Sequence, residues 1–174
     1  MSDYTADERM LCARHEATHA VFTVILGGWL NAVGIPKADG SPPKNSSIRG
    51  RRRGRPMGYA NCNNINSGLN GFQALVGHAF EVANGDPNRA LTDYQDAKEL
   101  IPAEAFDDAV NLADVLVGQL AVLIDTVANQ LMAKATKLGV IDGRKLDKIA
   151  ESIQNELGDE LDSICKQIRG CCAS

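Results

Sequence analysis

The chain has 174 residues, of which 44% are hydrophobic and 23% are charged, a composition typical of one globular domain that excludes a disordered or fibrous protein. These residues leave no room for a second enzyme module beside a domain of ordinary size, so we expect a single domain over 1–174. The formal net charge is −4, so no overall field attracts the protein to nucleic acid or membrane, and partners must be recognised locally.

The first predicted element is a helix near the N-terminus. Thr5 and Glu8 form a capping-box pattern, and no proline or glycine follows until Gly27-Gly28, so we expect about five or six helical turns. Apolar residues and two histidines recur along this helix at intervals of three and four: Leu11, His15, His19, Phe22 and Leu26. Both histidines are therefore predicted to lie on the stripe that faces the core.

No targeting or membrane segment is predicted. The first eight residues are acidic where a secretory signal would be basic, and no apolar run follows before His15. The longest apolar run, Ala20 to Leu30, is too short to span a bilayer.

Two short runs after the first helix, 30–36 and 57–62, are predicted to be strands. The stretch between them, 39–56, is rich in Gly, Pro, Ser and Arg, and we expect it to be a long mobile loop. It carries six basic residues: Lys44, Arg49, Arg51, Arg52, Arg53 and Arg55. The sequence thus predicts a small sheet of two or three strands around this basic loop.

The remainder of the chain is predicted to be helical. Helical spacing and turn residues indicate segments over 69–83, from 87 or 92 to 100, over 103–138, and over 144–168. Glycines at 139 and 143 separate the last two segments. The predicted fold class is therefore α+β, mainly α, with a small sheet.

The cysteines indicate a reducing compartment, and we expect a cytoplasmic protein. Five cysteines, an odd number, are present without a C-x-x-C pair: Cys12, Cys62, Cys165, Cys171 and Cys172. The final residues have the position of a prenylation box but lack its aliphatic residues, so we interpret 169–174 as a frayed tail that carries thiols.

The first helix carries an H-E-x-x-H motif, His15-Glu16-Ala17-Thr18-His19. Residues four apart are neighbours on one helix face, so the two imidazoles can bind one Zn²⁺ at about 2.0 to 2.1 Å each. Glu16 reaches the edge of that face, where it can accept a proton from a water on the metal without being a ligand. The motif predicts a metal site at which Glu16 can act on a bound water.

Two other interpretations of the motif are weaker. In the first, His15 and His19 are buried core histidines satisfied by hydrogen bonds. Burying two polar imidazoles one turn apart lowers stability unless something binds them. A purely structural zinc site would normally use four ligands rich in cysteine, and no cysteine has suitable spacing. A catalytic site needs a third ligand, and spacing alone leaves five candidates open: His78, Glu81, Asp86, Asp93 and Asp96.

Residues 13–21, Ala-Arg-His-Glu-Ala-Thr-His-Ala-Val, resemble the zinc-site helix of the FtsH family, the membrane-bound ATP-dependent zinc metalloproteases, which reads HEAGHA. Later segments resemble this family in the same order. These are 31–37 (its first strand after that helix), Pro56-Met57-Gly58-Tyr59 (A-L-G-Y), 75–81 with Gly85 (G-R-A-A-E), Asp93 to Ala97 (D-L-x-x-A) and 116–149 (its closing helices). The resemblance covers about residues 9–150.

This resemblance implies a helical zinc-metalloprotease domain in which His15, His19 and Asp93 bind Zn²⁺ and Glu16 is the general base. Glu81 matches a family glutamate on a buried helix, which implies a supporting position beside the ligands. The implied activity is a zinc metalloendopeptidase that hydrolyses peptide bonds. Family members assemble as hexameric rings, so a homo-oligomer is expected.

The chain also departs from the family. Thr18 replaces the family's glycine, and the ATPase module and membrane segments are absent from these 174 residues. We therefore expect flexible peptides or unfolded proteins as substrates, lying along the Met57 to Asn61 run, and a separate ATPase chain as a possible partner.

The basic segment allows a different interpretation of the whole chain. We expect it to be a solvated loop, and the alternative is a patch for RNA or an acidic partner. No aromatic residue lies within it to stack on bases, so nucleic acid is not the expected partner. The alternative function is a catalytically inactive binding or assembly module that uses the Arg-rich loop 49–55.

Overall fold

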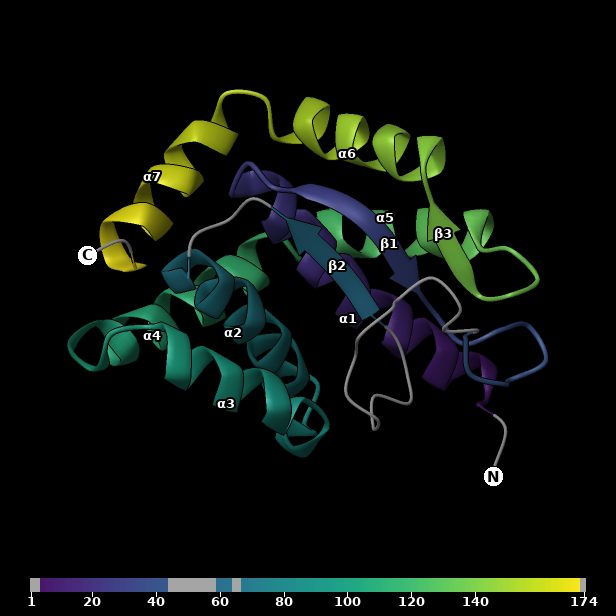
Figure 1. Cartoon of the computed structure of the whole chain (residues 1–174), viewed down its shortest axis with the longest axis horizontal. Helices are drawn as coiled ribbons and strands as arrows, with labels where there is room; N and C mark the ends of the chain where they lie inside the picture. The colour runs from purple at the N-terminus through teal and green to yellow at the C-terminus, as the bar shows by residue number, and fades with distance from the viewer. Residues whose placement is uncertain (1–3, 44–58, 64–66, 173–174) are drawn as a thin grey trace.

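The computed structural model describes residues 4–43, 59–63 and 67–172 of the chain. The predicted fold class is confirmed, because these residues form a mainly helical α+β domain with one small sheet (Figure 1). In chain order the elements are α1 (Ala6–Ile25), β1 (Trp29–Gly34), β2 (Tyr59–Asn63), α2 (Ser67–Ala83), the 3-10 helix η1 (Pro87–Ala90), α3 (Leu91–Leu100), α4 (Ala103–Gln119), α5 (Ala121–Lys134), β3 (Val140–Asp142), α6 (Arg144–Leu157) and α7 (Glu160–Cys172).

The helix α1 forms as its sequence predicts. The Thr5 hydroxyl accepts a hydrogen bond from the Glu8 amide at 3.2 Å, and the Glu8 carboxylate accepts one from the Thr5 amide at 2.7 Å, which completes the capping box. Gly27 follows the helix with a φ of +79°, a left-handed conformation that favours glycine. The helix packs against α2, α5 and the sheet, so it lies at the centre of the domain (Figure 1).

The sheet has three antiparallel strands in the order β2-β1-β3. The strand β1 lies between the other two, and its Val33 pairs with Ile141 of β3. The third strand occupies a stretch that the sequence marked only as a break between helices. The β-branched pair Val140-Ile141 lies between two glycines with positive φ, Gly139 and Gly143, and this is a common pattern for a short strand bounded by turns.

The single long helix predicted over 103–138 is wrong. The structure has two helices there, α4 and α5, bent by 69° at Leu120. A straight helix of this length would extend about 54 Å, beyond the other elements of a small domain. The bend instead lets α4 pack on α2 while α5 packs on α1, so that Leu116 and Leu131 share one core.

The single helix predicted over 144–168 is also wrong, because α6 ends at Gly158, whose φ is +48°. The next helix, α7, continues to Cys172, which is buried with Ile164 and Ile168 at intervals of four residues. Residues 169–172 of the predicted frayed tail are therefore helical, and residues 173–174 lie outside the described part of the chain.

The predicted loop over 39–56 is described only to residue 43. Its first residues form a turn in which Asp39 accepts a hydrogen bond from the Ser41 amide at 2.9 Å. Residues 44–58, which include all six basic residues, lie outside the described part of the chain. The strand that follows begins at Tyr59, so Met57 and Gly58 also lie outside it.

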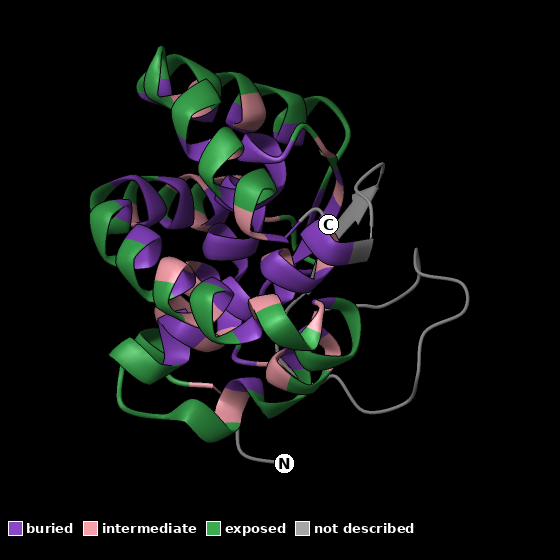
Figure 2. Cartoon of the chain, turned by 90° about the vertical axis from the view of Figure 1, so that its left-hand side faces the viewer, coloured by how far each residue is buried: buried purple, intermediate pink, exposed green. Residues whose placement is uncertain are grey.

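The core is one continuous cluster of apolar side chains (Figure 2). The helices expose their outer faces and bury their inner ones. Within the described residues, no single helix combines the length and apolar character needed to cross a membrane, and α4 with α5 meets that test only as the bent pair. A few charged or polar side chains of the described residues are buried in this apolar surrounding, and most of them belong to α1.

Candidate metal centre

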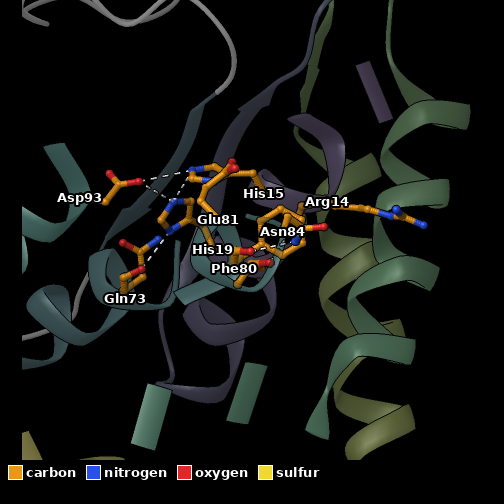
Figure 3. A network of polar contacts seen from close by, with 9 residues as sticks. Arg14, His15, His19, Gln73, Phe80, Glu81, Asn84 and Asp93 are labelled. Carbon is orange, nitrogen blue, oxygen red and sulfur yellow. Dashed lines mark hydrogen bonds and ion pairs between the residues drawn. The ribbon is translucent and has the colours of Figure 1, made fainter. Parts of the chain in front are cut away.

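Three buried or nearly buried side chains from two helices meet beside α1. His15 and His19 lie one turn apart on α1, and Asp93 lies in the first turn of α3. The two Nε2 atoms are 3.1 Å apart, and Oδ2 of Asp93 is 3.3 Å from Nε2 of His15 and 3.5 Å from Nε2 of His19 (Figure 3). Two nitrogen donors and one carboxylate oxygen thus form a nearly equilateral triangle.

The size of this triangle fits a tetrahedral metal ion. Two ligands held at about 2.0 to 2.1 Å from Zn²⁺ with tetrahedral angles are separated by about 3.3 Å. The three observed separations lie on both sides of this value. One ion can therefore contact all three donor atoms and keep a fourth position for a water or substrate, the arrangement of catalytic zinc sites.

The outer nitrogen of each imidazole is also held. Nδ1 of His19 lies 2.9 Å from the backbone carbonyl of Gln73, and because a carbonyl only accepts hydrogen bonds, Nδ1 carries the proton. Nδ1 of His15 lies 3.0 Å from Oε1 of Glu81, whose carboxylate is buried on α2. A neutral ring protonated at Nδ1 presents the lone pair of Nε2 to the triangle, and such outer contacts commonly orient histidine ligands of metals.

A glycine on α2 makes the close approach of this helix possible. A Cβ atom at Gly77 would lie 2.5 Å from both Cε1 and Nε2 of His19, and 3.0 Å from Oδ2 of Asp93. No real side chain tolerates the shorter distance, so only glycine lets the backbone of α2 pass beside the triangle.

The centre contains more acidic than basic groups. Three buried carboxylates, Glu16, Glu81 and Asp93, surround the two imidazoles. Burial lowers the pKa of His15, but Asp93 and Glu81 outweigh it and raise the pKa to about 10. Burial would raise the pKa of Asp93, yet both histidines hold it well below its usual range. The cluster therefore favours an added positive charge, which a divalent cation would supply.

Two further residues of the motif lie on α1 as predicted. Glu16 is 4% exposed and follows His15 directly in the helix. Thr18, which replaces the glycine of the FtsH family, is fully buried, and its hydroxyl donates to the Arg14 carbonyl at 2.9 Å. The extra bulk is thus accommodated within α1, with the hydroxyl satisfied by the preceding turn.

The structure distinguishes among the five candidates for the third ligand. Asp93 joins the triangle, and Glu81 contacts the outer nitrogen of His15. His78 packs against Tyr94 with ring centroids 4.7 Å apart, as expected for a packing residue. Asp86 is exposed and Asp96 is half-buried, and neither belongs to the metal-binding group found among the described residues.

Two contributors were missed from the sequence. The Gln73 contact uses a backbone carbonyl, which no side-chain pattern reveals. Gly77 lies inside a predicted helix, and an isolated glycine in such a place is an indication of close packing that could have been used. Arg14, a neighbour of the motif, points away from the centre (Figure 3). It pairs with Asp125 of α5 at 2.8 Å.

Comparisons of the chain with protein-family models, with curated proteins and with solved structures found no match. The resemblance to the FtsH family therefore stays a prediction that rests on the sequence motifs. The function has to be inferred from the chemistry of the centre itself.

Proposed function

We propose that the protein is a zinc-dependent metallopeptidase of the FtsH-protease type. The observation that carries this proposal is the triangle of donor atoms at 3.1 to 3.5 Å, formed by His15, His19 and Asp93 beside the helix that also bears Glu16. A zinc ion held there would polarise the scissile carbonyl and lower the pKa of a bound water towards about 7.

The protein's own groups have distinct tasks in this reaction. The outer contacts of His15 and His19 hold both imidazoles so that their Nε2 atoms face the triangle. Glu16 accepts the proton of the attacking water on its carboxylate and passes it to the leaving amine nitrogen. Its burial keeps bulk water away from this carboxylate.

The sheet supports a peptide as the substrate. Within the described residues β2 is an edge strand, because the order β2-β1-β3 gives it a neighbouring strand on one side only. An extended peptide can add to such an edge through main-chain hydrogen bonds, so we propose unfolded or flexible chains as substrates. Association with a separate ATPase and assembly into a homo-oligomer stay predictions. The four described cysteines are free thiols, which supports the prediction of a reducing, cytoplasmic location.

The decisive test compares the wild type with Glu16→Gln, which keeps the shape of the side chain and removes the base. We expect both proteins to bind one zinc per chain by metal analysis. The wild type should cleave casein and a fluorogenic peptide and lose this activity to a chelator, whereas Glu16→Gln should be slower by about 10² to 10⁴-fold.

Two outcomes would overturn the proposal. Stoichiometric zinc without cleavage by the wild type would favour the inactive binding or assembly module. Equal cleavage by both proteins would show that Glu16 is not the general base and would point to a contaminating protease. A matched control is Glu99→Gln, an exposed glutamate of α3, which should behave as the wild type.

A further inference from the structure

The third ligand of the candidate centre reaches α1 by way of another helix. Asp93 lies in the first turn of α3, and the main packing partners of α3 within the described residues are α2 and η1, not α1 (Figure 1). The two histidines, by contrast, lie one turn apart on α1, which fixes their mutual position. The position of Oδ2 of Asp93 relative to both Nε2 atoms therefore depends on how the first turn of α3 is held on α2.

One stripe of α2 runs beside the ligands. Gln73, Gly77 and Glu81 recur on this helix at intervals of four residues, and each lies beside a histidine of the triangle. A Cβ atom at Gly77 would be only 3.0 Å from Oδ2 of Asp93, so the backbone of α2 also passes close to the third ligand. Glycine permits this approach, but it has no side chain with which to hold α3 in place.

The next residue of each helix supplies such an attachment. His78 follows Gly77 on α2, and Tyr94 follows Asp93 on α3. The centroids of the His78 and Tyr94 rings are 4.7 Å apart, with an interplanar angle of 45°. Tyr94 also meets Phe106 of α4 edge to face, with centroids 5.5 Å apart and an angle of 82°. Both separations lie in the favourable range for ring pairs, so the Tyr94 ring is held by contacts with two other helices.

We propose that Tyr94 is a positioning residue for the metal centre, which holds Asp93 where it can act as the third ligand. This inference rests on the proposed function, because the task exists only if a metal binds at the triangle. The Cα atoms of Asp93 and Tyr94 are joined by one peptide unit and lie about 3.8 Å apart, so fixing the ring of Tyr94 also fixes the backbone of Asp93. Metal–ligand distances tolerate deviations of only about 0.2 Å, so a small displacement of this turn weakens the third contact.

The burial of the rings separates this task from ordinary core packing. His78 and Tyr94 are both half-buried, at the border of the apolar core. Their contact therefore removes less apolar surface from water than a fully buried pair would. We expect the loss of the ring contacts to weaken zinc binding through Asp93 in particular, whereas the loss of a fully buried side chain elsewhere should lower stability without this effect.

Zinc affinity, measured by competition with a chromophoric chelator, tests the inference on the full chain. Tyr94→Phe keeps the ring and should bind zinc as the wild type does, whereas Tyr94→Ala should lose about 10-fold to 100-fold in affinity. His78→Ala removes one of the two ring contacts and should lose an intermediate amount. Ile153→Ala is the control, because Ile153 is fully buried on α6, whose main packing partners do not include α2 or α3. It should lower the thermal unfolding temperature and keep the zinc affinity.

A double-mutant cycle asks whether Tyr94 acts through Asp93. Once Asp93→Ala has removed the ligand, adding Tyr94→Ala should cause no further loss of affinity, a result that a general weakening of the fold would not give. Cobalt(II) provides a spectroscopic readout, because its visible absorption depends on the ligand set and geometry. The spectrum of Tyr94→Ala should shift towards that of Asp93→Ala, and Tyr94→Phe should keep the wild-type spectrum.

The outcomes distinguish this inference from the function on which it rests. Wild-type zinc affinity in Tyr94→Ala, or an equal loss in Tyr94→Phe, would overturn the positioning role and leave the metal centre intact. A further loss in the Asp93→Ala background would also overturn it. If Tyr94→Ala does not fold, His78→Ala decides, and wild-type affinity in that variant would overturn the role. A wild type that binds no zinc would overturn the proposed function itself, and this inference with it.

Discussion

The substitution Gly77→Ala tests whether the three donor atoms act as one metal site. The added methyl carbon would lie 2.5 Å from Nε2 of His19, the atom that faces the triangle, and 3.0 Å from Oδ2 of Asp93. Carbon and nitrogen atoms normally approach to about 3.5 Å, so the ring or α2 has to move by about 1 Å. Metal–ligand distances tolerate only about 0.2 Å, and such a movement takes His19 out of the coordination sphere.

The expected loss of zinc affinity is large compared with the effect on folding. Disturbing the partners of metal ligands commonly costs 10 to 100-fold, and a direct clash with a ligand should cost at least about 100-fold, or about 2.8 kcal/mol. The metal-free protein should change less. Overpacking lowers the free energy of unfolding by about 1 to 3 kcal/mol, and replacing a helical glycine by alanine offsets about 0.5 to 1 kcal/mol of this loss.

Competition with a chromophoric chelator measures the affinity, and thermal unfolding with and without chelator measures the stability. Two other glycines provide matched controls. A Cβ at Gly118 meets nothing within 4 Å, so Gly118→Ala should leave zinc binding unchanged. A Cβ at Gly71 would meet Ile101 at 2.7 Å, away from the centre, so Gly71→Ala should destabilise the fold and keep the affinity. Wild-type zinc affinity in Gly77→Ala would refute the reasoning.

Three further predictions concern single side chains. Asp93→Ala should lower zinc affinity sharply while Asp96→Ala should not, as measured by the same chelator competition, and the reverse result would contradict the choice of third ligand. Thr5→Ala should lower the free energy of unfolding by about 1 kcal/mol in denaturant titrations, because it removes the N-cap of α1. The Thr5 hydrogen bonds lower the pKa of Glu8, so the capping contribution should be present above the pKa of the unfolded chain and be lost as pH falls through the folded value. Thr5→Ala should reduce this loss, and identical pH profiles would argue against it. Burial raises the pKa of Cys12 to about 11, so at pH 8 its reaction with Ellman's reagent in the folded protein should be at least about 100-fold slower than that of a free thiol. Rapid labelling that Cys12→Ser removes would contradict its burial.

The first helix and its motif could be predicted because their determinants are local. The Thr5–Glu8 capping box, the glycine end and the spacing of His15 and His19 all lie within about six turns of one helix. The third ligand could not be chosen by spacing, because it depends on how α2 and α3 fold back onto α1. Long-range packing of this kind leaves no periodicity in the segment that contains Asp93, and only its resemblance to the D-L-x-x-A segment of the FtsH family indicated this ligand.

The predicted lengths of the helices in the C-terminal half were wrong for a related reason. Apolar spacing continues through Leu120 with little change, and only the need to cover one compact core bends the chain there. The end of α6 could have been predicted from the sequence, because Gly158 is a glycine and glycine readily adopts the positive φ that follows this helix. The sheet contains one strand of each kind. The strand β1 was predicted from its own residues, whereas β3 forms by pairing with β1, which lies far away along the chain.

The separation of the ligands along the chain has a thermodynamic consequence. His19 and Asp93 are about 75 residues apart, and β1, β2 and α2 lie between them. A zinc ion bound by both would act as a cross-link that closes a large loop, and closing such a loop in the unfolded chain is worth about 4 kcal/mol in the chain-entropy description. Loop entropy grows slowly with length, about 0.6 kcal/mol per doubling. Insertions or deletions within 44–58 would therefore hardly change the loop-entropy part of the stabilisation that the metal provides.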